Sequence, residues 1–199
     1  MPYSQFSIEQ IKTTFGIAFS SKMGLFADIS EREYSNLLQE TLQFNLPLAV
    51  EINSEKARSE LIIAPILLEI KRQMPERISL FSGREFNVDA AKGLSGYCDF
   101  LISRSPEQLV IESPVIALVE AKNDNIQLGL GQCAAEMIAA QIFNQQRENE
   151  IETIYGVVTT GSIWKFLKLK EQSIEIDTSE YFINNVGKIL GILIKFIES

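Results

Sequence analysis

The sequence predicts an α/β protein with a central mixed β-sheet flanked by helices. Short apolar segments of strand character recur between residues 78 and 169, and helical segments precede, separate and follow them. The central strand segments are almost continuously apolar, which is typical of strands covered by helices on both faces. We find no internal repeat, low-complexity tract or linker, so we expect one domain over residues 1–199.

The first 50 residues predict an N-terminal helical cap on the main body. Apolar residues recur at helical spacing in residues 7–20 and 31–43, and Ser30 is a candidate N-cap for the second helix. A strongly apolar helix is expected from Asn53 to about Met74, with a kink at Pro65 because proline interrupts helical hydrogen bonding.

The main body is expected over residues 53–170, and a C-terminal helix lies within residues 179–199. The strands of the main body are predicted at residues 78–88, 97–103, 114–122, 155–160 and 163–169. A helix over about 130–146 separates the third strand from the fourth, and the final amphipathic helix covers 179–197.

Composition excludes several kinds of chemistry. The chain has no histidine, which removes Ser-His-Asp and Cys-His triads and zinc sites with imidazole ligands. Any catalysis must therefore use carboxylates, lysine, hydroxyls or a hard metal ion. The 18 Lys and Arg against 26 Asp and Glu give a net charge of −8, which disfavours non-specific attraction to nucleic acid.

The sequence also indicates a compartment. Two cysteines, Cys98 and Cys133, form no metal-binding motif and no disulfide framework, so we expect them to be small buried residues in a reducing environment. The N-terminus lacks the features of a signal peptide, and the longest apolar runs, such as 61–68, are too short to span a membrane. We expect a soluble, cytoplasmic protein with no membrane partner.

Charged residues end two of the apolar strands. Glu120 and Lys122 close the segment PVIALVEAKND, and their spacing of two places both on one face of a strand. Asp99 lies in GYCDFLI, 120 − 99 = 21 residues earlier, so an antiparallel pair of strands would bring it beside Glu120. The alternative, a surface Glu-Lys pair at a strand end, leaves Asp99 among apolar neighbours unexplained.

Carboxylates and an ammonium at buried strand ends are costly unless they pair or bind a cation. Mg²⁺ prefers oxygen ligands and commonly uses one or two carboxylates. A metal-activated water near Lys122 could attack a phosphodiester, with metal and ammonium stabilising the charge that develops.

Two helices offer supporting side chains. Glu55 and Glu60 precede the strands on one helix, but about 500° of rotation separates them, so we expect only one to face the site and favour Glu60. Gln132 and Glu136 lie one turn apart on the following helix, where Gln132 could hold a phosphate or a metal ligand. The alternative for this second pair is a solvated helix face.

These residues resemble the signature of the PD-(D/E)XK nuclease superfamily, also called restriction-endonuclease-like: a helical Glu (Glu60), a strand acid (Asp99), then Glu120-Ala121-Lys122. The segments SEKARSELIIAPIL and GQCAAEM are similar to type I restriction-subunit N-terminal nucleases and related predicted endonucleases, and the likeness covers about 53–169. Cys98 replaces the proline of the family's name.

The resemblance implies a restriction-endonuclease-like core and a Mg²⁺ or Mn²⁺ site on Asp99, Glu120 and Glu60, with Lys122 beside the attacking water. We therefore expect a metal-dependent endonuclease acting on DNA, with Glu60 and Gln132 supporting catalysis, linked to restriction, repair or mobile elements. The alternative is a catalytically silent nuclease-fold protein that binds nucleic acid or regulates a partner, which the acidic charge favours. A homodimer or a protein partner is compatible with both.

The segment IWKFLKLK carries two further interpretations. Trp164 with Lys165, Lys168 and Lys170 could form a strip that faces nucleic acid. The simpler interpretation is an edge strand whose lysines discourage pairing with other sheets.

Overall fold

In the computed structural model, which describes residues 2–149 and 151–199, eight strands form one mixed sheet flanked by helices. This confirms the predicted α/β class. The strand order across the sheet is β1-β7-β6-β5-β4-β3-β2, and the short β8 pairs with β6. The strands span Ala18–Lys22 (β1), Ser79–Glu85 (β2), Tyr97–Ser103 (β3), Val115–Ala121 (β4), Thr153–Thr159 (β5), Ile163–Lys170 (β6), Ser173–Asp177 (β7) and Tyr181–Phe182 (β8).

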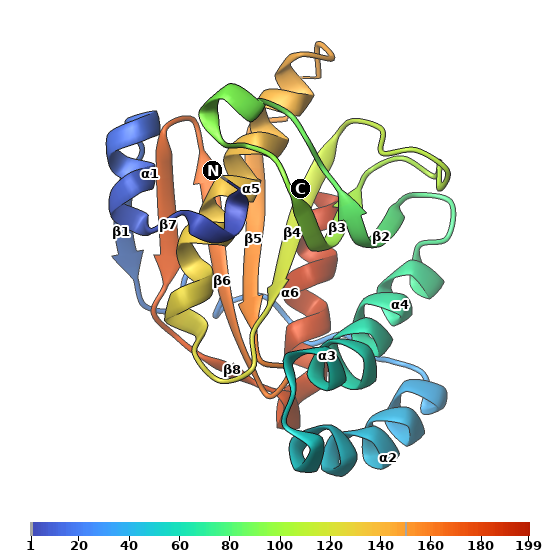
Figure 1. Ribbon diagram of the computed structural model, residues 1–199. Coiled ribbons are helices and arrows are strands. Elements are labelled where there is room, and N and C mark those ends of the chain that lie inside the picture. Colours follow the sequence, from blue (N-terminus) through green and yellow to red (C-terminus); the bar gives the residue numbers. More distant parts are fainter. Residues whose placement is uncertain (1, 150) are drawn as a thin grey trace.

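Helices cover both faces of the sheet, and α5 and α6 lie on opposite sides of it (Figure 1). One core cluster joins α1 and α5 to the sheet, and the other joins α6 and α4, against which α2 packs. The α-helices span Ile8–Phe15 (α1), Asn36–Ile52 (α2), Glu55–Arg58 (α3), Ala64–Gln73 (α4), Ile126–Gln145 (α5) and Val186–Glu198 (α6), and a π-helical turn, Ser59–Ile63, joins α3 to α4.

The helix predicted over residues 7–20 forms only from Ile8 to Phe15, and the prediction is wrong after that. Ser7 and Gln10 form a capping box at the start of α1, and Gly16 ends the helix with a left-handed φ of 68°. The chain then extends as β1, which pairs in parallel with β7 at one edge of the sheet. The N-terminal 50 residues are therefore not a purely helical cap, because part of them belongs to the sheet.

The second predicted helix, 31–43, begins and ends later. Ser35 rather than Ser30 is the N-cap, and both its backbone N–H and its hydroxyl donate to the carboxylate of Glu69. The helix continues to Ile52, through Pro47. The contact with Glu69 on α4 determines where the helix starts.

The helix expected from Asn53 to Met74 forms, with a local change at its middle. The π-helical turn ends at Ile63, two residues before Pro65. The carbonyl of Leu61, four residues before the proline, accepts a hydrogen bond from Asn45 Nδ2 at 2.8 Å. A side chain of α2 thus satisfies a carbonyl that proline cannot pair.

The remaining predicted elements form with shifted ends. The strands expected in residues 78–169 correspond to β2 to β6, and the helix expected over 130–146 begins four residues earlier, at Ile126. The helix expected over 179–197 starts only at Val186, because Tyr181 and Phe182 pair with β6 as β8. The strand β7 was not predicted.

Asp177 fastens the segment after β1 to the end of β7. Its carboxylate accepts hydrogen bonds from the backbone N–H groups of Gly24, Phe26 and Ser179 and from the Tyr181 hydroxyl. Burial raises the pKa of Asp177, but these bonds outweigh it and hold the pKa below its ordinary value.

We predict that Asp177→Asn lowers the free energy of unfolding by about 2 kcal/mol at neutral pH, because a charged acceptor is lost. The folded-state pKa lies below the unfolded value of about 3.9, so this stabilisation is complete above that value. It disappears as pH falls through the folded-state pKa. Urea unfolding at several pH values measures the difference. The exposed Asp28→Asn is the control, and equal stability of both variants at neutral pH would contradict the prediction.

Candidate functional site

The candidate site lies where β3 begins and β4 ends. The two strands are antiparallel, and the register pairs Phe100 with Val119, so Asp99 and Glu120 are the next residues on neighbouring strands. The backbone N–H of Ala121 donates to Asp99 Oδ2 at 2.8 Å. The predicted juxtaposition of the two acids is thus present in the structure.

Glu120 is the most constrained acid of the site. Its side chain is 1% exposed, Lys122 Nζ binds its Oε1, and Gln132 Nε2 donates to its Oε2 at 2.8 Å. Burial and the nearby charge of Asp99 raise the pKa of Glu120 to about 8, against the opposing effect of Lys122. The positive charge of Lys122 therefore does not offset the effects of burial and of Asp99 on Glu120.

Lys122 lies on the same face as Glu120, as the spacing of two predicted. Burial lowers the pKa of Lys122, but the carboxylates of Glu120 and Glu55 outweigh that effect and raise it. Glu55 Oε2 lies 3.9 Å from Lys122 Nζ. The ammonium is thus the central positive charge of the site, with acids on two sides.

Gly129 makes room for this lysine under α5. A Cβ at position 129 would lie 3.2 Å from Cγ and Cε of Lys122 and 2.6 Å from Cγ1 of Val158 on β5. The absence of a side chain lets α5 approach the ends of β4 and β5 closely. The sequence did not single out Gly129 for this role.

Gln132 and Glu136 both belong to the site. Gln132 Nε2 donates to Glu136 Oε1 at 3.1 Å in addition to Glu120, while Glu136 is fully buried and its Oε2 has no hydrogen-bond partner among the described residues. Burial, and then Glu120, raise the pKa of Glu136 well above its ordinary value. The alternative of a solvated helix face is wrong for Glu136.

Glu55 and Glu60 occupy different positions from those expected. Glu60 is 61% exposed and pairs with Lys56 at 2.7 Å, whereas Glu55 is the acid near Lys122. Both line one cavity of about 260 Å³ together with Asp99, so the expectation that only one could face the site does not hold. A regular α-helix would separate the two side chains by about 500° of rotation, but Glu60 lies in a π-helical turn, which changes that angle.

One cationic residue of α3, Arg58, was not predicted from the sequence. Arg58 donates to the carbonyl of Thr160 at 3.1 Å and to Asn53 Oδ1 at 3.1 Å, which fastens α3 to the end of β5. This contact holds the helix that carries Glu55 against the strand ends. A single arginine in a helical segment does not indicate in the sequence that it will contact the end of a distant strand.

The donor chemistry suits a hard cation. Asp99 is close enough to Glu120, and Glu120 to Glu136, to raise the neighbour's pKa, Lys122 pairs with Glu120, and one oxygen of Glu136 is buried without a partner among the described residues. Residues 2–149 and 151–199 contain no group of three or more His, Cys, Asp or Glu side chains arranged to hold a metal ion. A Mg²⁺ site here would therefore use one or two carboxylates, as such sites commonly do.

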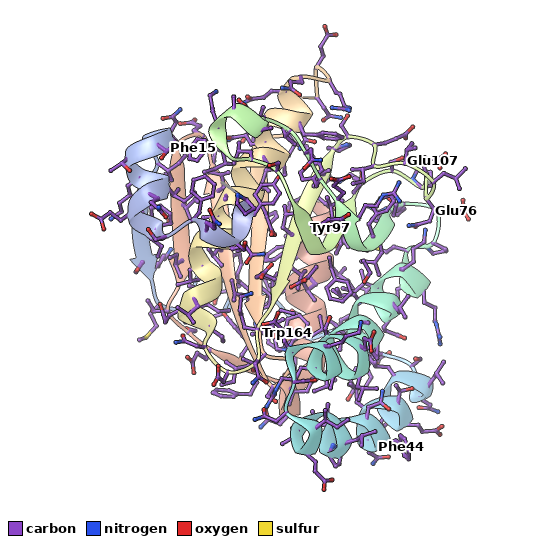
Figure 2. All side chains as sticks on the ribbon, viewed as in Figure 1. Phe15, Phe44, Glu76, Tyr97, Glu107 and Trp164 are labelled. Carbon is purple, nitrogen blue, oxygen red and sulfur yellow. The ribbon has the colours of Figure 1, made fainter. Side chains whose placement is uncertain are left out.

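Both interpretations of IWKFLKLK are wrong. The strand β6 lies between β5 and β7, so it is not an edge strand. Trp164 is fully buried inside the molecule, and Lys165 is 6% exposed, so neither can contact nucleic acid (Figure 2). Lys170, at the far end of β6, pairs with Glu152.

Other expectations concern the cysteines and membranes. Cys98 and Cys133 are both buried and unpaired with each other, as expected. Within the part of the chain that the structure describes, no helix is long and apolar enough to cross a bilayer.

No protein-family model matches the chain, and no curated protein sequence matches it either. Functional assignment therefore depends on the geometry of the site.

We predict that Gly129→Ala lowers the free energy of unfolding by about 1–3 kcal/mol, because the added methyl overlaps Val158 and displaces Lys122 or α5. This loss exceeds the helix-propensity gain of about 1 kcal/mol. Urea unfolding measures the change. Leu128→Ala, at an exposed neighbouring position, should stay within about 0.5 kcal/mol of wild type. A Gly129→Ala variant as stable as wild type would show that the helix has room to spare.

Proposed function

We propose that the protein is a metal-dependent nuclease of the PD-(D/E)XK type, with a restriction-endonuclease-like core, that hydrolyses DNA phosphodiester bonds. The observation that carries the proposal is the convergence of Asp99, Glu120 and Lys122 at the adjoining ends of two antiparallel strands. Asp99 and Glu120 would hold Mg²⁺ or Mn²⁺. Glu55 and Glu60 from the cavity wall and Gln132 from α5 support them.

The residues of the chain divide the work of hydrolysis. A bound divalent ion supplies an acidified water and neutralises phosphoryl charge. Lys122 remains protonated at neutral pH because its pKa is raised, so its ammonium can orient the attacking water and stabilise charge on the phosphoryl oxygens. Gln132 and Lys122 hold the two oxygens of Glu120 from opposite sides.

The second candidate is a catalytically silent protein of this fold that binds nucleic acid or regulates a partner. It is favoured by one observation: both oxygens of Glu120 already bind protein donors, so a metal ion must compete with Lys122 or share an oxygen with Gln132. The net charge of −8 points the same way. Two buried free cysteines support the cytoplasm as the compartment for either candidate.

We predict that Lys122→Ala reduces Mg²⁺- or Mn²⁺-dependent cleavage of plasmid and branched DNA by about 100-fold or more, because a charge-stabilising donor is lost. The control is Lys170→Ala. In the strand register Lys170 lies opposite Thr153, at the start of β5, whereas Glu120 lies opposite Val158, near the other end of that strand. Equal cleavage rates for wild type and Lys122→Ala would refute the catalytic assignment.

We predict that millimolar Mg²⁺ or Mn²⁺ raises the melting temperature of the wild type, because a ligand that binds only the folded state stabilises it by mass action. Asp99→Asn should abolish this shift, whereas Asp28→Asn, at an exposed position, should retain it. Comparing the shift rather than the melting temperature itself removes any effect of the substitution on folding. A wild type that shows no shift would support the silent candidate.

A further inference from the structure

The amide of Gln132 is shared by two carboxylates. Its Nε2 donates to Glu120 Oε2 at 2.8 Å and to Glu136 Oε1 at 3.1 Å. A side-chain NH₂ group has two donors, so both are used. The two acids thus hold the amide through both of its N–H groups.

Stability of the fold does not explain the presence of Glu136. The side chain is fully buried, its Oε2 has no partner among the described residues, and no ammonium or guanidinium forms an ion pair with it there. Replacing such a group by an apolar side chain of similar volume is commonly neutral or stabilising. Because burying Glu136 costs stability and its carboxyl group contacts Gln132, we expect its role in the site.

We propose that Glu136 is a positioning residue for Glu120. By accepting one N–H of Gln132, it keeps the other N–H on Glu120 Oε2, while Lys122 holds Glu120 Oε1. The Glu120 carboxylate is thereby fixed in one orientation before any ligand arrives. The inference rests on the proposed function, in which Glu120 is a metal ligand.

A second Gln-Glu pair in the same protein provides a matched control. In α4, Gln73 Nε2 donates to Glu69 Oε1 at 3.2 Å with the same spacing of four residues. Glu69 also accepts hydrogen bonds from the backbone and hydroxyl of Ser35, the N-cap of α2, so its carboxylate has a structural task. It lies outside the candidate site.

The test measures Mn²⁺ affinity by calorimetry and the melting temperature of the metal-free protein. Glu136→Met should melt at the same or a higher temperature than wild type, yet bind Mn²⁺ on the order of tenfold more weakly. Glu136→Gln should keep the affinity, because its amide oxygen can still accept from Gln132. Glu69→Met should melt at a lower temperature and bind Mn²⁺ as wild type does.

Wild-type affinity in Glu136→Met would overturn the proposal, and so would a loss of affinity accompanied by a lower melting temperature, since that indicates a structural role. A wild type that does not bind Mn²⁺ contradicts the proposed function instead. In that case, NMR measurement of side-chain amide proton exchange tests whether Glu136 holds Gln132 in place. Gln132 protons that exchange more slowly than those of exposed Gln127, and faster in Glu136→Met, would uphold it, whereas fast exchange in the wild type would overturn it.

Discussion

The burial of the Glu120 carboxylate is the constraint on which the site depends. A carboxylate that is 1% exposed and lies between a sheet and a helix must be compensated locally. Lys122 and Gln132 provide that compensation, one on each oxygen. The pKa of Glu120 is nevertheless raised, so Lys122 and Gln132 do not fully offset its burial and the nearby charge of Asp99.

The surrounding scaffold follows from that constraint. Gly129 leaves room for Lys122 and Val158 beneath α5, because a Cβ there would lie 3.2 Å from the lysine side chain and 2.6 Å from Cγ1 of the valine. Gln132 is one turn further along α5 and meets the same carboxylate from the other side. The antiparallel pairing of β3 with β4 then brings Asp99 against the backbone of Ala121, so a second acid lies beside the first.

The features of the site that depend on residues close in the sequence were predicted correctly, whereas strands that pair with distant segments were not. The spacing of Glu120 and Lys122 and the pairing with Asp99 follow from strand alternation and a short connection, and both are present in the structure. β1 was missed because its sequence, AFSSK, has little apolar alternation and its partner β7 lies some 150 residues away. Without β7, β6 was taken for an edge strand. Glu55 was misplaced relative to Glu60 because a π-helical turn leaves no mark in a hydrophobic pattern.

Glu69 on α4 and Glu136 on α5 are both buried, but their surroundings shift their pKa values in opposite directions. Burial raises the pKa of Glu69, but hydrogen bonds from Ser35 and Gln73 and the charge of Arg72 together outweigh it, so the pKa is lowered. Glu136 receives one bond from a neutral amide, and its pKa is raised well above the ordinary value. Glu69 therefore stabilises the start of α2 through Ser35, its N-cap, whereas the raised pKa of Glu136 favours its neutral, protonated form beside Glu120. The difference follows from position, since Glu69 lies beside the N-terminus of α2, where Ser35 supplies two donors, whereas Glu136, in the middle of α5, receives a single hydrogen bond from Gln132 and its burial is offset less.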